Sequence, residues 1–177
     1  MKKIILFTFS ILLFVSSLQA QDRDFKRVSF GLQINNVHGN FGIGLQALSP
    51  EFYNMRVSLR GNLNWLSHQN DAQEETWTEY GMVQLGWQYH HMITNRIKLY
   101  TEGGMVGLIP NPKFSTDVFK VGGYGVFGFE FLFTDGEDRD WAYFVELGGT
   151  GTGARANRTL TNKFYATGFL VSVGFRF

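Results

Sequence analysis

The carboxy-terminal stretch Phe164 to Phe177 alternates in character with a period of two residues. A period of two is that of a β-strand, in which successive side chains point to opposite faces. The opposite face is smaller and more polar, and it carries Arg176. An apolar face that runs to a terminal Phe favours a strand with that face in lipid. This face is predicted to consist of Tyr165, Thr167, Phe169, Val171, Val173, Phe175 and Phe177.

The same alternation recurs upstream and predicts seven further strands. No segment has a helical period of convincing length, and all three prolines fall between the predicted strands, where their missing N–H is tolerated. The fold class is therefore all-β. The predicted strands are Arg27–Asn35, Phe41–Ala47, Tyr53–Trp65, Trp77–Tyr89, Ile97–Met105, Tyr124–Phe133 and Trp141–Gly148.

The lengths and charges of these strands predict an eight-stranded antiparallel up-and-down transmembrane β-barrel. A tilted strand needs roughly 9–11 residues to cross a bilayer, and bacterial single-chain barrels have an even number of strands. In lipid a closed sheet is the β arrangement that leaves no backbone edge unpaired. Charges fall on the faces predicted to point inward, where opposite charges can pair. These candidate lumen residues are Arg56, Arg60, Lys98, Glu102, Lys120, Glu130, Glu146 and Arg176.

A secreted lipocalin-like barrel or a β-sandwich is the alternative fold. Either would place the apolar face inward and leave the charged face outside. The row Phe127, Phe129, Phe131 and Phe133 would then require a very large core. The membrane barrel accounts for this row more simply.

Residues 1–20 have the features of a cleaved signal peptide, which leaves 21–177 as the barrel domain. Lys2 and Lys3 precede an apolar core, and Ala20 is a small residue at the predicted cleavage point. The chain contains no Cys, which excludes disulfides and thiolate chemistry. The sequence suggests no cofactor, no metal site and no nucleic-acid partner.

Connection lengths predict the orientation of the barrel. Outer-membrane barrels have short periplasmic turns and longer outer loops, and the longer links here are Ser67–Thr76, Leu108–Asp117 and Thr150–Asn162. Both termini are then periplasmic. Interfacial aromatic girdles are predicted from Trp65, Trp77 and Tyr80 near the outer ends, and from Trp87, Tyr89, Trp141 and Tyr143 near the inner ends.

The terminal segment Val171–Phe177 resembles the carboxy-terminal signal strand of bacterial outer-membrane β-barrel proteins. In pattern and architecture the mature chain resembles small eight-stranded members such as OmpX and the OmpA membrane domain. The resemblance implies location in the bacterial outer membrane, contact with its lipid and lipopolysaccharide, and recognition of Phe164 to Phe177 by the barrel-assembly machinery. It also implies a lumen filled by side chains, with no general diffusion pore.

Two classes of function remain open. The first is a non-enzymatic barrel with a packed polar lumen, which supports the envelope or binds a surface partner through its outer loops. Arg155, Arg158 and Lys163 are candidates for contacts with lipopolysaccharide phosphates. A gated ion path through the lumen charges is a less favoured role for the same architecture.

The second class is a lipid A-modifying enzyme of the deacylase or acyltransferase type. Such chemistry requires a Ser activated by a nearby His, and the candidates are His38, Ser67, His68 and Ser115. Deacylases among barrels of this size carry a His two residues before a Ser on a late strand. The corresponding segment here, 148–153, contains only Gly and Thr. The sequence therefore favours the non-enzymatic class.

Overall fold

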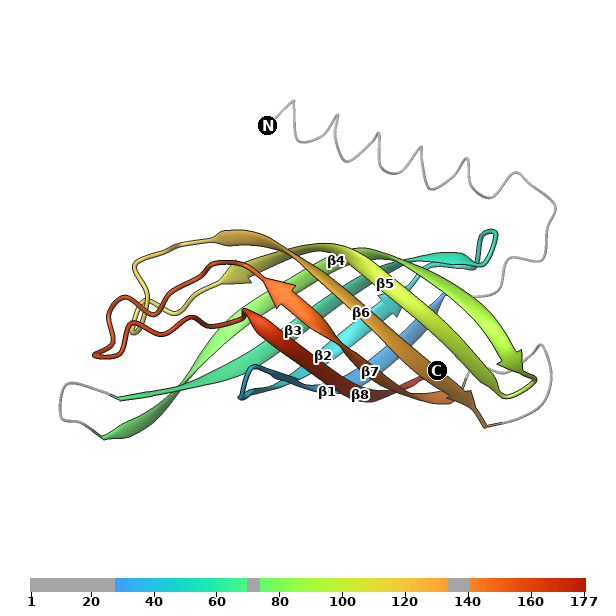
Figure 1. Ribbon diagram of the computed structural model, residues 1–177, viewed down its shortest axis with the longest axis horizontal. Helices are drawn as coiled ribbons and strands as arrows, with labels where there is room; N and C mark the ends of the chain where they lie inside the picture. Colours follow the sequence, from blue (N-terminus) through green and yellow to red (C-terminus); the bar gives the residue numbers. More distant parts are fainter. Residues whose placement is uncertain (1–27, 70–73, 134–140) are drawn as a thin grey trace, which may run out of the picture.

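The chain folds into one closed barrel of eight strands in which every neighbouring pair is antiparallel (Figure 1). The structure, a computed structural model, describes residues 28–69, 74–133 and 141–177. Strand order follows the chain, and β8 pairs with β1 to close the sheet. The predicted fold class is confirmed. The strands are β1 (Ser29–Val37), β2 (Asn40–Leu48), β3 (Met55–Gln69), β4 (Glu75–Thr94), β5 (Ile97–Ile109), β6 (Lys120–Leu132), β7 (Ala142–Gly151) and β8 (Gly168–Arg176).

The predicted signal peptide, residues 1–20, lies outside the described residues, as do residues 21–27. Among the described residues, no helix has the length and apolar character needed to cross a membrane.

Strand alternation continues further than the sequence suggested at one hairpin. β3 extends to Gln69 and β4 begins at Glu75, so both ends of the predicted loop Ser67–Thr76 are paired strand. At its other end β4 runs to Thr94, through most of the predicted turn at His90–Arg96. At the β3–β4 hairpin, polar side chains hid the extension, because a strand that continues beyond the apolar outer wall needs no apolar face.

β8 is shorter than predicted, and its first two outward positions were assigned wrongly. The strand begins at Gly168, where φ is +123°, and Ala166 before it also has a left-handed φ of 49°. These conformations turn the chain inward, so Tyr165 is fully buried and Thr167 is only partly exposed. Alternation of residue types cannot reveal such a reversal, because a buried loop aromatic and a lipid-facing one look alike in sequence.

The apolar face of the sheet points out of the barrel. Leu45, Phe127 and Phe169 are 64%, 47% and 59% exposed on the outer wall. This is the reverse of a lipocalin-like arrangement. The four aromatics predicted near the inner ends, Trp87, Tyr89, Trp141 and Tyr143, are also exposed there. Tyr80 is the exception among the predicted girdle residues, since it points inward and is buried.

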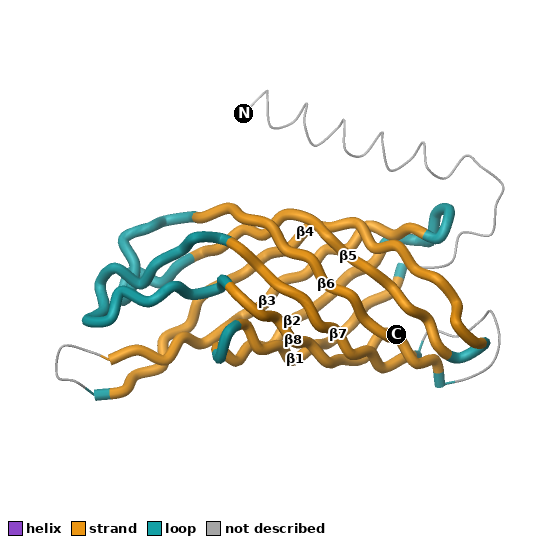
Figure 2. The backbone as a smooth tube through the Cα atoms, in the orientation of Figure 1, coloured by secondary structure: helices purple, strands orange, loops and turns teal. Residues whose placement is uncertain are grey.

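The two ends of the barrel differ (Figure 2). At one end, called here the turn end, β1 begins and β8 ends, and residues 49–54 and 95–96 connect their strands. At the opposite end, called the loop end, residues 110–119 join β5 to β6 and residues 152–167 join β7 to β8. The β1–β2 link at the loop end is a tight hairpin at His38 and Gly39, both with left-handed φ.

The lumen is filled by side chains in two layers. The layer toward the turn end is charged and polar. The layer toward the loop end is apolar and includes side chains of both long loops, so those loops fold into the mouth of the barrel. The apolar layer consists of Val37, Leu66, Tyr80, Met82, Val106, Leu108, Phe114, Tyr124, Val126, Ala154, Ala156, Tyr165, Ala166 and Leu170.

Candidate functional site: the lumen network and the loop-end cap

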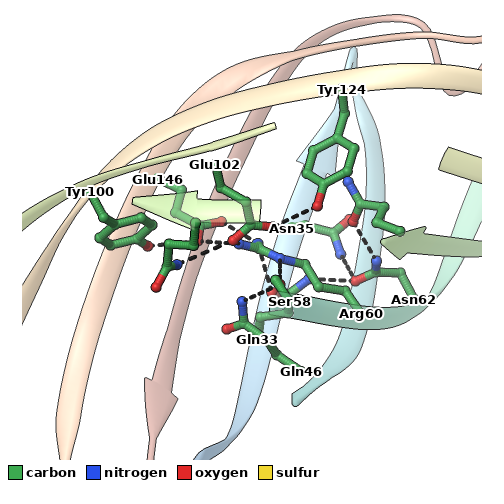
Figure 3. A network of polar contacts seen from close by, with 12 residues as sticks. Gln33, Asn35, Gln46, Ser58, Arg60, Asn62, Tyr100, Glu102, Tyr124 and Glu146 are labelled. Carbon is green, nitrogen blue, oxygen red and sulfur yellow. Dashed lines mark hydrogen bonds and ion pairs between the residues drawn. The ribbon is translucent and has the colours of Figure 1, made fainter. Parts of the chain in front are cut away.

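Arg60, on β3, lies at the centre of the charged layer. It is 1% exposed and donates through Nη1 and Nη2 to both carboxylate oxygens of Glu146 on β7, with the Nη2–Oε1 distance at 2.7 Å. Its Nη2 also donates to Glu102 Oε2 on β5. One guanidinium therefore joins three strands across the lumen, and the paired geometry is the strong, bidentate form of such a contact (Figure 3).

Arg176, on β8, forms a second centre that shares a partner with the first. It donates to Glu130 Oε2 at 2.6 Å and to Glu146 Oε1 at 3.2 Å. Its guanidinium carbon lies 4.2 Å from the ring centroid of Phe144 and 4.7 Å from that of Tyr100. Glu146 thus bridges the two arginines. The guanidinium of Arg176 also lies over the rings of Tyr100 and Phe144, in cation–π contact with both.

Two buried tyrosines complete the network. The hydroxyl of Tyr100 donates to Glu146 Oε1 at 2.6 Å, and that of Tyr124 donates to Glu102 Oε1 at 2.6 Å. Gln88 Nε2 donates to Glu102 Oε2 at 3.2 Å. These donors saturate carboxylates that would be costly to bury with fewer partners.

The turn end carries a third ion-pair group, formed by one turn residue and two strand residues. Glu51, in the turn between β2 and β3, accepts from Arg56 Nη2 at 3.3 Å and lies 3.1 Å from His90 Nε2. Arg56 and His90 both point inward and are buried. The backbone N–H of His90 also donates to the carbonyl of Asn54, which ties the turn to β4.

The structure places seven of the eight predicted lumen charges inside the barrel. Lys98 lies directly across from Glu130 in the β5–β6 register, and its side chain is buried. Lys120 is the exception, because it sits at the loop end of β6 and pairs with Asp117 at 3.5 Å with its side chain 40% exposed. Its position at the first residue of the strand explains the error, since alternation assigns a face but no depth. The predicted residues inside the lumen are Arg56, Arg60, Lys98, Glu102, Glu130, Glu146 and Arg176.

Sequence reasoning missed the charge that enters from a turn. Glu51 belongs to no strand, and the turn signal around Pro50 gave no direction for its side chain. Alternation could predict that Tyr100 and Tyr124 point inward. Their hydrogen-bond partners depend on distances across the lumen, which alternation does not give. Nothing in a single strand's pattern reports the strand that faces it across a barrel.

A folded cap closes the loop end. The ring of Phe114, from the β5–β6 loop, contacts Tyr80 and Tyr165 edge-on at centroid distances of 6.3 and 5.0 Å. Ser115 Oγ donates to the carbonyl of Arg155, and the backbone N–H of Thr116 donates to Asn157 Oδ1 at 2.9 Å. The two long loops are therefore joined to one another and anchored to the lumen wall.

The three candidate lipopolysaccharide contacts lie on this cap and are exposed. Arg155 stacks over the ring of Phe164 at 4.3 Å, and Arg158 donates to the carbonyl of Pro112 at 2.6 Å. None of the described contacts joins these two arginines to Lys163 or to each other. The three residues therefore belong to one exposed loop, between β7 and β8, and the described contacts do not form them into a preorganised anion site.

The candidate catalytic residues are not brought together. His68 lies on β3, buried, with Nε2 at 2.9 Å from Thr78 Oγ1. Ser67 Oγ donates to Glu75, and Ser115 Oγ donates to a backbone carbonyl. His38 is at the tip of the β1–β2 hairpin. Among the described residues, neither Ser67 nor Ser115 is hydrogen-bonded to a histidine.

Comparisons with known proteins support the fold. The chain is similar to the crystal structure of the N-terminal β-barrel domain of OprF from Pseudomonas aeruginosa, with a TM-score of 0.55 and 12% identity. The match covers 85% of this chain and 96% of that domain. No family model and no curated protein matches the sequence. The chain therefore has the fold of the small eight-stranded outer-membrane barrels.

Proposed function

We propose that this protein is a bacterial outer-membrane β-barrel that supports the envelope and binds surface partners through its loop end. The observation that carries the proposal is the combination of an apolar outer wall with a lumen closed by ion pairs. Exposed Leu45, Phe127 and Phe169 suit contact with lipid acyl chains. The fold likeness to the OprF barrel domain supports the same location.

The orientation follows the usual asymmetry of such barrels. The loop end faces the exterior, and both termini lie in the periplasm after removal of residues 1–20. Lipopolysaccharide surrounds the cap, where Arg155, Arg158 and Lys163 contact its phosphates. The assembly machinery recognises the carboxy-terminal segment Phe164 to Phe177, whose strand portion is β8.

The closed lumen supports a role without conduction. Arg60 and Arg176 form ion pairs with Glu102, Glu130 and Glu146, and the cap covers the loop end. Catalysis on lipid A has no assembled His–Ser pair to support it among the described residues. A structural and binding role is therefore favoured over a channel or an enzyme.

One preparation tests the membrane location, the closed lumen and the non-enzymatic role. Detergent-refolded protein is run on SDS electrophoresis with and without boiling, and the same sample is measured in planar bilayers and incubated with lipid A. We expect a heat-dependent mobility shift, no steady ion conductance and unchanged lipid A. A soluble chain without a mobility shift would contradict the membrane location, whereas lasting conductance or altered lipid A would contradict the closed, non-enzymatic role.

A further inference from the structure

The outer wall carries an apolar groove with a volume of about 1010 Å³. It lies between two neighbouring rows of outward residues, in which each residue is the register partner of the next across six strands. The first row consists of Tyr143, Phe175, Leu32, Leu45, Gly61 and Val83. The second row consists of Val145, Val173, Ile34, Ile43, Leu63 and Gly81. All twelve residues line the groove, which is called here the wall groove.

The wall groove rises obliquely from the turn end toward the middle of the wall. Its rows cross the strands, which are themselves inclined to the long axis of the barrel (Figure 1). The first row begins at Tyr143 and Phe175, which lie one residue from the turn-end limits of β7 and β8. It ends at Val83, near the middle of β4.

The dimensions of the wall groove match one leaflet of a bilayer. Neighbouring strands are about 4.8 Å apart, so a row that crosses six strands is about 24 Å long. With strands tilted by about 40°, such a row rises about 15 Å along the barrel axis. The hydrocarbon core of a bilayer is about 30 Å thick. The groove therefore spans the depth of a single leaflet, the one at the turn end.

Two outward glycines, Gly61 and Gly81, leave the upper end of the wall groove without side chains. Among the described residues, a Cβ added at Gly61 would meet no heavy atom within 4 Å beyond its chain neighbours. Packing inside the barrel therefore does not require glycine at this position. A glycine within a strand weakens the strand and often marks the close approach of a ligand. The end of a hydrocarbon chain can lie here directly on the backbone.

The lower end of the wall groove lies beside a positive charge. Phe133 borders this end, and its ring stacks on that of Phe175 with centroids 6.5 Å apart. The N–H of Leu132 donates to the carbonyl of Arg96 at 2.8 Å, so the exposed Arg96 belongs to the same rim. A lipid phosphate at this rim is complementary in charge to the guanidinium.

We propose that the wall groove binds one acyl chain of a phospholipid from the periplasmic leaflet, with the phosphate of that lipid beside Arg96. The apolar lining favours a hydrocarbon occupant, the length favours a chain of one leaflet, and the charge at the lower end favours entry from the turn end. The inference rests on the proposed membrane location and orientation, and it assigns one retained lipid to one part of the wall.

The test uses full-length protein refolded in detergent micelles that contain phosphatidylethanolamine. Native mass spectrometry then counts the lipid retained by each barrel, and we expect one molecule. G61L fills the upper end of the groove and should reduce retention at least about tenfold. G151L is the matched control, because Gly151 is also exposed, lies outside the groove and offers the same open space to a Cβ among the described residues. It should retain lipid as the wild type does.

Two further measurements locate the lipid. R96Q should lower retention several-fold, because the phosphate loses its positive partner. NMR of the wild type should show contacts between the acyl chain and the methyl groups of Ile43 and Leu63. Equal retention by G61L and the wild type, or contacts confined to other parts of the wall, would overturn the proposal.

The same preparation distinguishes other occupants. Preferential retention of lipid A added to the same micelles would overturn the assignment to the periplasmic leaflet. A lipid-free dimer that G61L disrupts would assign the groove to a second copy of the chain and would also overturn it. A heat-modifiable barrel that retains no phospholipid refutes this inference alone and leaves the proposed membrane location intact.

Discussion

Glu146 on β7 and Arg60 on β3 form a bidentate ion pair across the lumen, although 86 positions separate them in the sequence. Glu146 also accepts from Arg176 and from the hydroxyl of Tyr100. A single carboxylate thus links β3, β5, β7 and β8 inside the barrel.

Replacing Glu146 with Gln should destabilise the barrel strongly. The change removes the one carboxylate that pairs with both Arg60 and Arg176, and breaking a buried pair costs about 3–5 kcal/mol. Urea unfolding of the refolded protein in lipid vesicles measures the loss. K163Q on the exposed cap is the control and should change the unfolding free energy by no more than about 0.5 kcal/mol. Equal effects of the two variants would show that the lumen network contributes no stability.

Membrane insertion should be sensitive to charge on the outer wall. Val173 is 43% exposed on β8 and lies in register with Ile34 and Val145 on the neighbouring strands, which are also exposed. V173R should cost about 2–4 kcal/mol if this position lies near the bilayer midplane. Folding into vesicles, followed by the heat-dependent mobility shift, reports the effect, and V173L is the matched control. Normal folding of V173R would contradict lipid contact at this wall.

The cap should detach when its central ring is removed. Phe114 is fully buried between Tyr80 and Tyr165, so F114A should release the β5–β6 and β7–β8 loops while the paired strands stay intact. Truncation of a buried Phe costs about 3–5 kcal/mol when the site cannot collapse. Limited proteolysis should then cut within 110–119 and 152–167. L160A, at a position 60% exposed on the same cap, should leave the cleavage pattern unchanged.

Residues that alternate within single strands were predictable, whereas contacts across the barrel were not. The inward positions of Arg60, Glu102 and Glu146 follow from a period of two. Their pairing depends on which strands face each other across the lumen, and no strand's own pattern contains that information.

Errors clustered where the chain leaves the ladder. Glu51 enters the lumen from a turn, Tyr165 enters it from a loop, and Lys120 lies above the charged layer. Each position is set by backbone direction or by depth along the barrel axis. Residue type and alternation report neither quantity.

The stability of the cap should fall at alkaline pH. Burial is the main cause that raises the pKa of Tyr165 from 10.0 to about 12, and the nearby Asp117 carboxylate adds to the increase. A raised pKa in the folded state means that the contribution of Tyr165 to stability is complete below pH 10. It is lost progressively as pH rises from 10 toward 12, because the unfolded phenol then ionises first.

Urea unfolding of the wild type and of Y165F at pH 9 and pH 11 measures this contribution. Y165F keeps the ring that packs on Phe114 and removes the ionising group. The wild type should therefore lose more stability than Y165F between the two pH values, since titration of the remaining tyrosines is common to both proteins. An identical loss in the two proteins would show that the Tyr165 phenol ionises as readily in the folded chain as in the unfolded one.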